Sequence, residues 1–279
     1  MTKLPAPSSQ EEVARVLDVL TFGELEIEGR LVDASNLALL GQLELGDVRM
    51  RVIYKPVQGE RPLWDFPDGT LADREAAAFV LSAVGGWGLV PPTVLRDGPH
   101  GPGSVQLWVD AVEDGTATAS LINVVKPAEL EPGWLPVLEA QLADGTAVVV
   151  AHADLPELAS AAVFDVVINN ADRKGSHLVL DELGSLWGFD HGVSLHAEPK
   201  LRTVLWGWAG KALPEAELAR LYALSGWLST PGSPVSVTLE RLLTAAEIDA
   251  LSQRIAGLLA TGRFPGPNSR GPAVPWPPL

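Results

Sequence analysis

The sequence contains no cysteine, and this absence excludes several kinds of protein. None of the 279 residues can form a disulfide or offer a thiolate to a metal ion. Secreted scaffolds held together by disulfides and zinc sites built from cysteines are therefore excluded. A chain without cysteine also suits a reducing compartment, so we expect a cytoplasmic protein.

Positive charge is scarce as well. The chain has 20 lysines and arginines against 35 acidic residues, which gives a formal net charge of -15. Nucleic acids and anionic membranes bind proteins through clustered cations, so we expect neither as a partner. The first residues contain no apolar signal core, and no apolar run approaches the roughly 20 residues that a membrane-spanning helix needs.

Hydrophobic residues make up 47% of the chain and follow two different patterns. Short apolar runs bounded by turn residues predict antiparallel strands within residues 25–56, 89–95 and 104–112. Among these runs, Thr70 with Asp73 predicts the start of a helix at 70–84. Residues 116–150 contain three prolines and predict a mixture of loop and strand, and helical spacing dominates after them. We therefore expect an α+β fold.

The two patterns divide the chain into two lobes, and its length is enough to bury a sizeable core. The expected organisation is an N-terminal helix at 1–20, an N-lobe at 21–113, a C-lobe at 114–263 and a proline-rich tail at 264–279. The tail has six prolines in 16 residues. We expect it to be extended, either along the surface or disordered.

Residues 163–195, VFDVVINNADRKGSHLVLDELGSLWGFDHGVSL, concentrate the candidate functional side chains. Asp172 precedes a short apolar strand at 178–180, and Asp190 follows a second one at 186–189. Two short strands joined by a tight turn bring these two acids together. Phosphoryl transfer uses such a pair, because one carboxylate holds the acceptor hydroxyl and the other holds the metal that bridges the phosphates.

A helical pattern leads into this stretch. Asp154 and Glu157 predict its N-terminal cap, and Asp165 falls on its apolar face. A buried carboxylate is costly without hydrogen bonds. We therefore expect Asp165 to accept hydrogen bonds from the following loop or from Arg173.

The motif N-x-D-R at residues 170–173, a polar residue five positions after Asp172, and the motif F-D-x-G at 189–192 resemble the phosphatidylinositol 3- and 4-kinase superfamily, especially its bacterial type II 4-kinase-like branch. The resemblance implies a bilobed protein-kinase-like fold with an antiparallel sheet in the N-lobe and a mainly helical C-lobe. It also implies a phosphotransferase that uses ATP with Mg²⁺ or Mn²⁺.

The resemblance assigns roles to both loops. In the catalytic loop at 169–177 it implies Asp172 and Arg173 as catalytic residues, and in the metal loop at 188–192 it implies Asp190 as a metal ligand. The family usually has a metal-binding Asn where this chain has His177. A neutral imidazole nitrogen can still bind a divalent ion, but it suits manganese or zinc better than magnesium.

The resemblance also implies contacts to the nucleotide. Lys55, at the end of the third strand, is expected to neutralise the phosphates of ATP. Glu75 is expected to pair with Lys55, but Asp73 remains an alternative because it shares a helical face with the apolar residues. The other implied contacts are Ser35 and Asn36 in a turn near the phosphates and Gln106, Trp108 and Asp110 at the hinge between the lobes.

Two other kinds of function stay open. A nucleotide-binding pseudokinase or regulatory module is favoured by His177, and turnover separates it from an active kinase. A metal hydrolase would use His177, His191 and His196 together with the two aspartates, although the sequence has no established ligand spacing for it. The acceptor is unknown, and a protein or small molecule is favoured over a lipid because the expected substrate loop has few cations.

Overall fold

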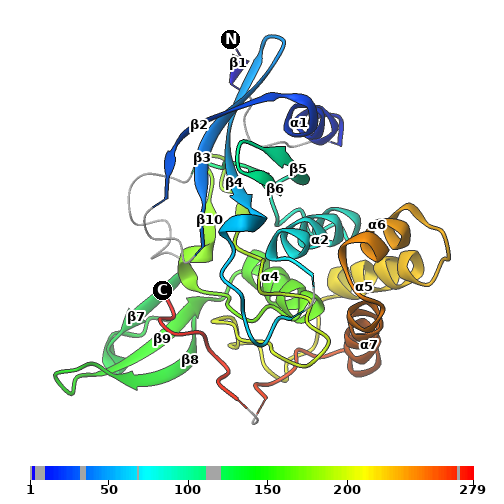
Figure 1. The fold of residues 1–279 in the computed structure, drawn as a ribbon. Coiled ribbons are helices and arrows are strands. Elements are labelled where there is room, and N and C mark those ends of the chain that lie inside the picture. Colours follow the sequence, from blue (N-terminus) through cyan, green and yellow to red (C-terminus); the bar gives the residue numbers. More distant parts are fainter. Residues whose placement is uncertain (1, 4–9, 32–35, 68, 111–120, 269–270) are drawn as a thin grey trace.

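The computed structural model describes residues 2–3, 10–31, 36–67, 69–110, 121–268 and 271–279. It has two lobes, with an antiparallel sheet in the first and helices in most of the second (Figure 1). This confirms the expected α+β fold with two lobes. The expected boundary between the lobes, at residues 113 and 114, lies outside the described residues.

The N-lobe is built around one sheet. Its strands are β2 (Glu24–Arg30), β3 (Leu39–Leu45), β4 (Val48–Pro56), β5 (Thr93–Gly98) and β6 (Gly101–Leu107). They lie in the order β2-β3-β4-β6-β5, and the short β1 (Thr2–Lys3) pairs with β4 in parallel. The resulting sheet has one strand more than the sequence predicts.

Strand β4 shows how this sheet positions a functional side chain. Successive residues of a strand point to opposite faces. Met50, Val52 and Tyr54 are buried in a hydrophobic cluster with helix α1 (Gln10–Phe22). Lys55 therefore points to the other face, toward the second lobe.

Helix α2 (Leu71–Val84) joins the two lobes. Thr70 and Asp73 form its predicted capping box, in which each side chain bonds the backbone N–H of the other residue. Its apolar residues belong to the core of the C-lobe. Arg74 forms a buried ion pair with Glu247 of the C-lobe, with 2.5 Å between Nη2 and Oε1. Figure 1 shows α2 between the sheet and the C-lobe helices.

The C-lobe combines helices with two small sheets. Its helices are α4 (Pro156–Ile168), α5 (Glu215–Leu228), α6 (Pro234–Leu242) and α7 (Ala245–Thr261). Strands β7 (Ile122–Val125), β8 (Trp134–Gln141) and β9 (Ala147–Ala153) form a three-stranded sheet, and β10 (Leu178–Leu180) pairs with β11 (Leu186–Gly188). Single 3-10 turns occupy Val57–Gly59, Pro127–Glu129 and Gly175–His177. In the described part of the chain, no helix has the length and apolar character needed to cross a membrane.

Two local predictions for the C-lobe need correction. The cap of α4 is Leu155 and makes no side-chain hydrogen bond, because Asp154 instead accepts one from the indole N–H of Trp208. The proline-rich tail is extended, as expected, but part of it is buried instead of lying wholly on the surface. Phe264 and Pro275 are buried, and the tail runs back across the C-lobe toward β10 (Figure 1).

Candidate active site

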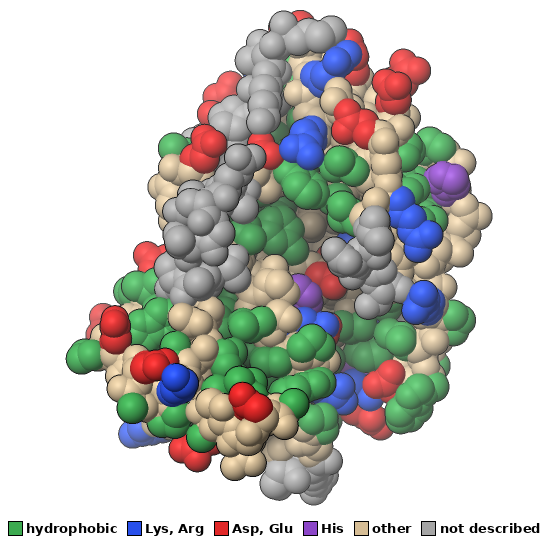
Figure 2. Space-filling model, turned by 90° about the vertical axis from the view of Figure 1, so that its left-hand side faces the viewer, with side chains coloured by type: hydrophobic (Ala, Val, Ile, Leu, Met, Phe, Trp, Pro, Cys, Tyr) green, Lys and Arg blue, Asp and Glu red, His purple; other side chains and the backbone are tan. Residues whose placement is uncertain are grey.

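A cavity of about 1090 Å³ lies between the lobes. Figure 2 shows one face of the molecule hollowed near its centre, where acidic, basic and histidine side chains gather. Eight of the residues singled out from the sequence line the cavity: Asn36, Lys55, Glu75, Gln106, Trp108, Asp172, His177 and Asp190. Residues from distant parts of the chain thus meet at one site.

Lys55 connects the two lobes at this cavity. Its Nζ lies 2.5 Å from Oε1 of Glu75 and 2.9 Å from Oδ1 of Asp190. Burial by itself lowers the pKa of Lys55, but the two carboxylates outweigh burial and raise the pKa above its ordinary value. The ammonium group is therefore charged at neutral pH and holds an acid from each lobe. Glu75 occupies this position, and Asp73 is used in the helix cap.

Asp190 lies where β11 has ended and the chain turns sharply. Its φ of 58° is left-handed, a conformation that Asp tolerates better than most residues. The side chain is 55% exposed, and it faces the cavity. The Lys55 ammonium holds the pKa of Asp190 well below its ordinary value, against the opposing effect of burial. Asp190 therefore presents an ionised carboxylate to the cavity.

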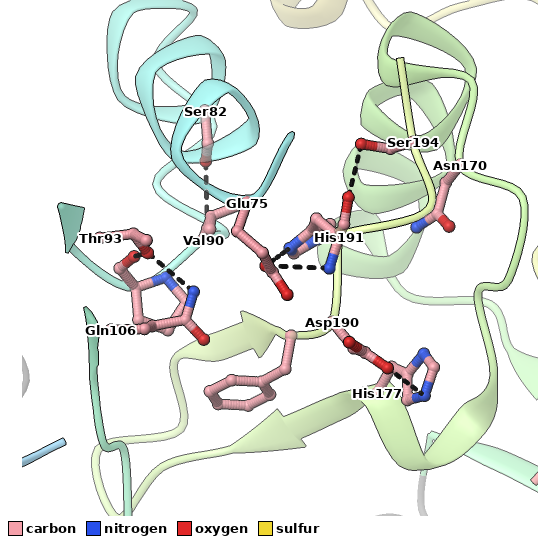
Figure 3. A network of polar contacts seen from close by, with 12 residues as sticks. Glu75, Ser82, Val90, Thr93, Gln106, Asn170, His177, Asp190, His191 and Ser194 are labelled. Carbon is pink, nitrogen blue, oxygen red and sulfur yellow. Dashed lines mark hydrogen bonds and ion pairs between the residues drawn. The ribbon is translucent and has the colours of Figure 1, made fainter. Parts of the chain in front are cut away.

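His177 is the nearest neutral ligand candidate to that carboxylate. Its Nε2 lies 3.7 Å from Oδ2 of Asp190, and Figure 3 shows the two side chains facing each other. Burial is the main cause that lowers the pKa of His177, although Asp190 opposes it. The ring is therefore neutral near pH 7 and can offer a nitrogen lone pair to a cation.

The catalytic loop begins at a helix end. Helix α4 stops at Asn169, whose φ of 52° is left-handed. The amide oxygen of Asn170 then accepts a hydrogen bond from the Asp172 backbone N–H at 3.0 Å. The carboxylate of Asp172 lines the cavity and lies 3.1 Å from Nζ of Lys174. The loop thus holds the Asp172 carboxylate at the cavity, partly exposed and paired with Lys174.

Arg173 is fully buried and is not among the residues that line the cavity. It pairs with Asp165, with 3.0 Å between Nη2 and Oδ1, as the sequence predicts. It also donates to Nε2 of His191 at 2.8 Å and to the carbonyl of Phe189 at 3.2 Å. Arg173 therefore ties the catalytic loop to the metal loop. This geometry favours a positioning role over the expected direct catalytic contact.

His191 extends the same connection to the N-lobe. Because an arginine N–H can only donate, Nε2 of His191 must accept, and the proton of the neutral ring is on Nδ1. Burial and the Arg173 charge hold the pKa of His191 well below its ordinary value. The His191 backbone N–H donates to Oε2 of Glu75 at 3.1 Å (Figure 3). The metal loop is thus fixed to α2.

The residues predicted to contact the nucleotide differ in where they lie relative to the cavity. Trp108 lines the cavity beyond the end of β6, whereas Asp110 does not and instead accepts a hydrogen bond from the Trp108 indole at 2.9 Å. Gln106 is buried, and its amide donates to the hydroxyl of Thr93 at 2.8 Å (Figure 3). The Asn36 side-chain oxygen accepts from the Arg61 backbone N–H at 2.9 Å, which fixes a loop over the cavity. Ser35 lies outside the described residues.

The three histidines of the metal hydrolase hypothesis do not converge. His191 is buried behind the loop, and Nδ1 of His196 accepts a hydrogen bond from the Glu198 backbone N–H. Among the described residues, no group of three or more His, Asp or Glu side chains could hold a metal ion. The structure therefore gives no support to a histidine-based metal hydrolase.

Several residues of the site have no recognisable signal in the sequence. Both carboxylate oxygens of Glu60 accept hydrogen bonds from the backbone at the start of α2, at 2.9 and 3.0 Å. Lys200 pairs with Asp65, which lines the cavity, at a distance of 3.3 Å between Nζ and Oδ2. Arg202 bonds through its backbone to the residues on either side of Ala171 and Asp172. A polar residue in a loop predicts none of these distant pairings.

Comparison with known proteins places the fold and the family. No family model matches the chain. The crystal structure of the Golgi casein kinase superposes on 92% of this chain and 75% of its own, with a TM-score of 0.53 and 13% identity. The Helicobacter pylori proinflammatory kinase CtkA covers 86% of this chain and 97% of its own, with a TM-score of 0.38 and 13% identity.

The sequence relationship is much closer to a mycobacterial protein. Protein Rv2133c of Mycobacterium tuberculosis (strain ATCC 25618 / H37Rv) is 48% identical over 264 residues, which cover 93% of this chain and 94% of the relative. The likeness to the Golgi casein kinase shows a kinase-like fold, and the identity to Rv2133c extends over nearly the whole of both chains. The chain therefore belongs to the family of protein Rv2133c.

Proposed function

We propose that this protein is a phosphotransferase that uses ATP and a divalent metal ion and resembles the phosphatidylinositol 3- and 4-kinases. One observation carries the proposal. Lys55 pairs with both Glu75 and Asp190 at a cavity that Asp172 also lines. A kinase requires this combination of a strand lysine, a helix glutamate and two loop aspartates.

We assign the nucleotide an orientation in the cavity. Lys55 carries the positive charge for the phosphates, so the adenine lies toward Trp108 and Val109, where the chain leaves β6. The ring can be recognised there by backbone groups and by the apolar wall that includes Ile53 and Val179. Asn36 supports the loop above the phosphates. Gln106 and Asp110 act through the hydrogen bonds that hold the hinge region.

The residues near Asp190 fit a divalent cation. Asp190 offers an ionised oxygen, and His177 offers a neutral ring whose buried Nδ1 has no hydrogen-bond partner in the described structure. Magnesium sites in kinases use one or two protein ligands and complete their coordination with phosphate oxygens and water. A cation held there supplies charge neutralisation for the transferred phosphoryl group.

Asp172 is the residue placed to orient the acceptor. Its carboxylate can accept the proton of an acceptor hydroxyl at the cavity, and Lys174 can stabilise the charge that remains nearby. Arg173 contributes indirectly, because it fixes the loops that carry Asp172 and Asp190. The acceptor oxygen would then bond to the γ-phosphorus of ATP as the bond to the β-phosphate oxygen breaks, and ADP would be the leaving group.

Replacing His177 with Asn tests the metal preference. Asparagine supplies an oxygen, which magnesium prefers, in place of a nitrogen. We compare the nucleotide affinity measured with Mn²⁺ with the affinity measured with Mg²⁺. We expect the ratio of the first to the second to fall about tenfold, which corresponds to about 1.4 kcal/mol of binding free energy. Calorimetric titration with each metal measures the ratio. His100→Asn, at an exposed turn, is the matched control, and an unchanged ratio in His177→Asn would exclude His177 as a ligand.

The acceptor we infer is a protein or a small molecule rather than a lipid, because the strongly acidic chain gives little attraction to anionic membranes. Incubation with ATP, Mg²⁺ or Mn²⁺ and a cell extract, followed by location of the labelled phosphate, tests the function. We expect labelling of a discrete acceptor by the wild type and none by Asp190→Asn. Binding of ATP without any transfer would instead favour a pseudokinase, the alternative that His177 keeps open.

A further inference from the structure

The proline-rich tail ends against the catalytic loop. The carbonyl of Pro278 accepts a hydrogen bond of 2.8 Å from the backbone N–H of Gly175, which lies between Asp172 and His177. Farther back, the carbonyl of Ala273 accepts hydrogen bonds from the Thr203 backbone N–H at 3.1 Å and from the Trp206 indole at 2.8 Å. Residues 273–279, which we name the strap, therefore bind two segments of the active-site side of the C-lobe.

Side-chain packing supports the same placement. Pro275 and Pro278 are buried, and Pro277 and Leu279 line the cavity. A Cβ added to Gly175 would lie 2.7 Å from Cδ2 of Leu279. The close approach of the strap thus depends on a glycine in the catalytic loop.

The contact has a specific consequence for the loop. Gly175–His177 is a single 3-10 turn, a short element with little internal hydrogen bonding of its own. The Gly175 backbone N–H donates its hydrogen bond to the strap, and the His177 backbone N–H donates to the carbonyl of Lys174. The strap therefore fixes the start of the turn from which His177 projects toward Asp190, three residues after Asp172.

We propose that the strap positions the catalytic loop, so that the placement of Asp172 and His177 for phosphoryl transfer depends on residues 273–279. This inference rests on the proposed function. The strap lies far from Lys55 in sequence and contacts the loop rather than the N-lobe, so its removal affects turnover more than nucleotide binding.

Deletion of residues 276–279 is the first test. The measured reaction is release of phosphate from ATP, with water as the acceptor of the γ-phosphoryl group. We expect kcat to fall at least about tenfold, while the calorimetric affinity for ATP changes less than about threefold. Equal turnover by the deleted and full chains overturns the proposal, as does a loss that appears only in the affinity for ATP.

A smaller change tests the contact itself. Gly175→Ala crowds Leu279 without requiring a strained backbone, and we expect kcat to fall several-fold. Adding Leu279→Ala removes the closest atom and leaves only two atoms of Ile122 at 3.3 Å, so it is expected to restore much of the loss. Gly266→Ala, where an added Cβ meets nothing within 4 Å, is the matched control. Failure of the second substitution to restore turnover contradicts the proposed contact.

Hydrogen exchange separates failure of the strap from failure of the proposed function. The Gly175 amide is bonded to the strap, so deletion should speed exchange in a peptide covering residues 172–177, whether or not ATP is hydrolysed. Unchanged exchange overturns the strap even in an active enzyme. Faster exchange with unchanged turnover shows that the strap holds the loop but does not position it for transfer, and also overturns the proposal. If the full chain neither binds nor hydrolyses ATP, the proposed function fails, and exchange alone decides whether the strap holds the loop.

Discussion

Asp172→Asn is expected to lower the rate of phosphoryl transfer by about 10²- to 10⁴-fold, the range associated with loss of a positioned acid–base group. The amide has nearly the same shape as the carboxylate but cannot accept the proton of an acceptor hydroxyl. Asp172 lines the cavity on the catalytic loop and makes no contact with Lys55, so we expect the affinity for ATP to stay unchanged. Steady-state turnover and calorimetry measure the two effects separately.

The control for this substitution is Asp249→Asn on the exposed face of α7, which should change neither quantity. Asp172 also pairs with Lys174, so the melting temperature of the variant must be compared with that of the wild type. A folded Asp172→Asn variant with wild-type turnover would contradict the assigned role. If nucleotide affinity and turnover fall by the same factor, Asp172 acts in nucleotide binding and not in phosphoryl transfer.

Lys55→Met is expected to weaken ATP binding by about 10- to 100-fold. The substitution removes a charged donor to the phosphates, and hydrogen bonds to charged groups contribute about 1.5–3 kcal/mol. It also leaves Glu75, only 3% exposed, without the ammonium group that lies 2.5 Å away. We therefore expect a lower melting temperature in addition to weaker binding.

Calorimetry with ATP and Mg²⁺ measures the affinity, and thermal unfolding without nucleotide measures the stability. Lys211→Met, which alters an exposed lysine of the C-lobe, is the matched control and should leave both unchanged. If Lys55→Met loses stability but keeps its ATP affinity, Lys55 is a structural connection between the lobes and not a phosphate ligand.

Much of the candidate site was predictable because its signals are local. Asp172 and Asp190 stand at the ends of short apolar runs, and Lys55 ends a strand, so the order of elements brings them to one cavity. The choice between Asp73 and Glu75 needed the structure. Helical spacing favoured Asp73, but a residue three positions after a threonine cap bonds that cap, which leaves Glu75 for Lys55.

The rest depended on contacts between distant residues. The β7, β8 and β9 sheet was hidden because Pro136 lies within β8, and it is tolerated there since β8 is an edge strand with a register shift at that point. The sequence predicts Asp154 as a helix cap, yet its carboxylate accepts a hydrogen bond from the indole of Trp208, 54 positions later. The Arg74 to Glu247 ion pair and the strap join segments with no shared local pattern.

Calorimetric titration of the full chain with ATP, in Mg²⁺, in Mn²⁺ and with the metals chelated, decides whether a nucleotide site lies between the lobes. We expect one ATP to bind per chain, and this binding to depend on a divalent ion and to be weakened by Lys55→Met. We also expect binding at ATP concentrations below about 1 mM, the upper end of usual substrate constants. Absence of binding under all three conditions, or binding that neither the metal nor Lys55→Met affects, would contradict a nucleotide site between the lobes.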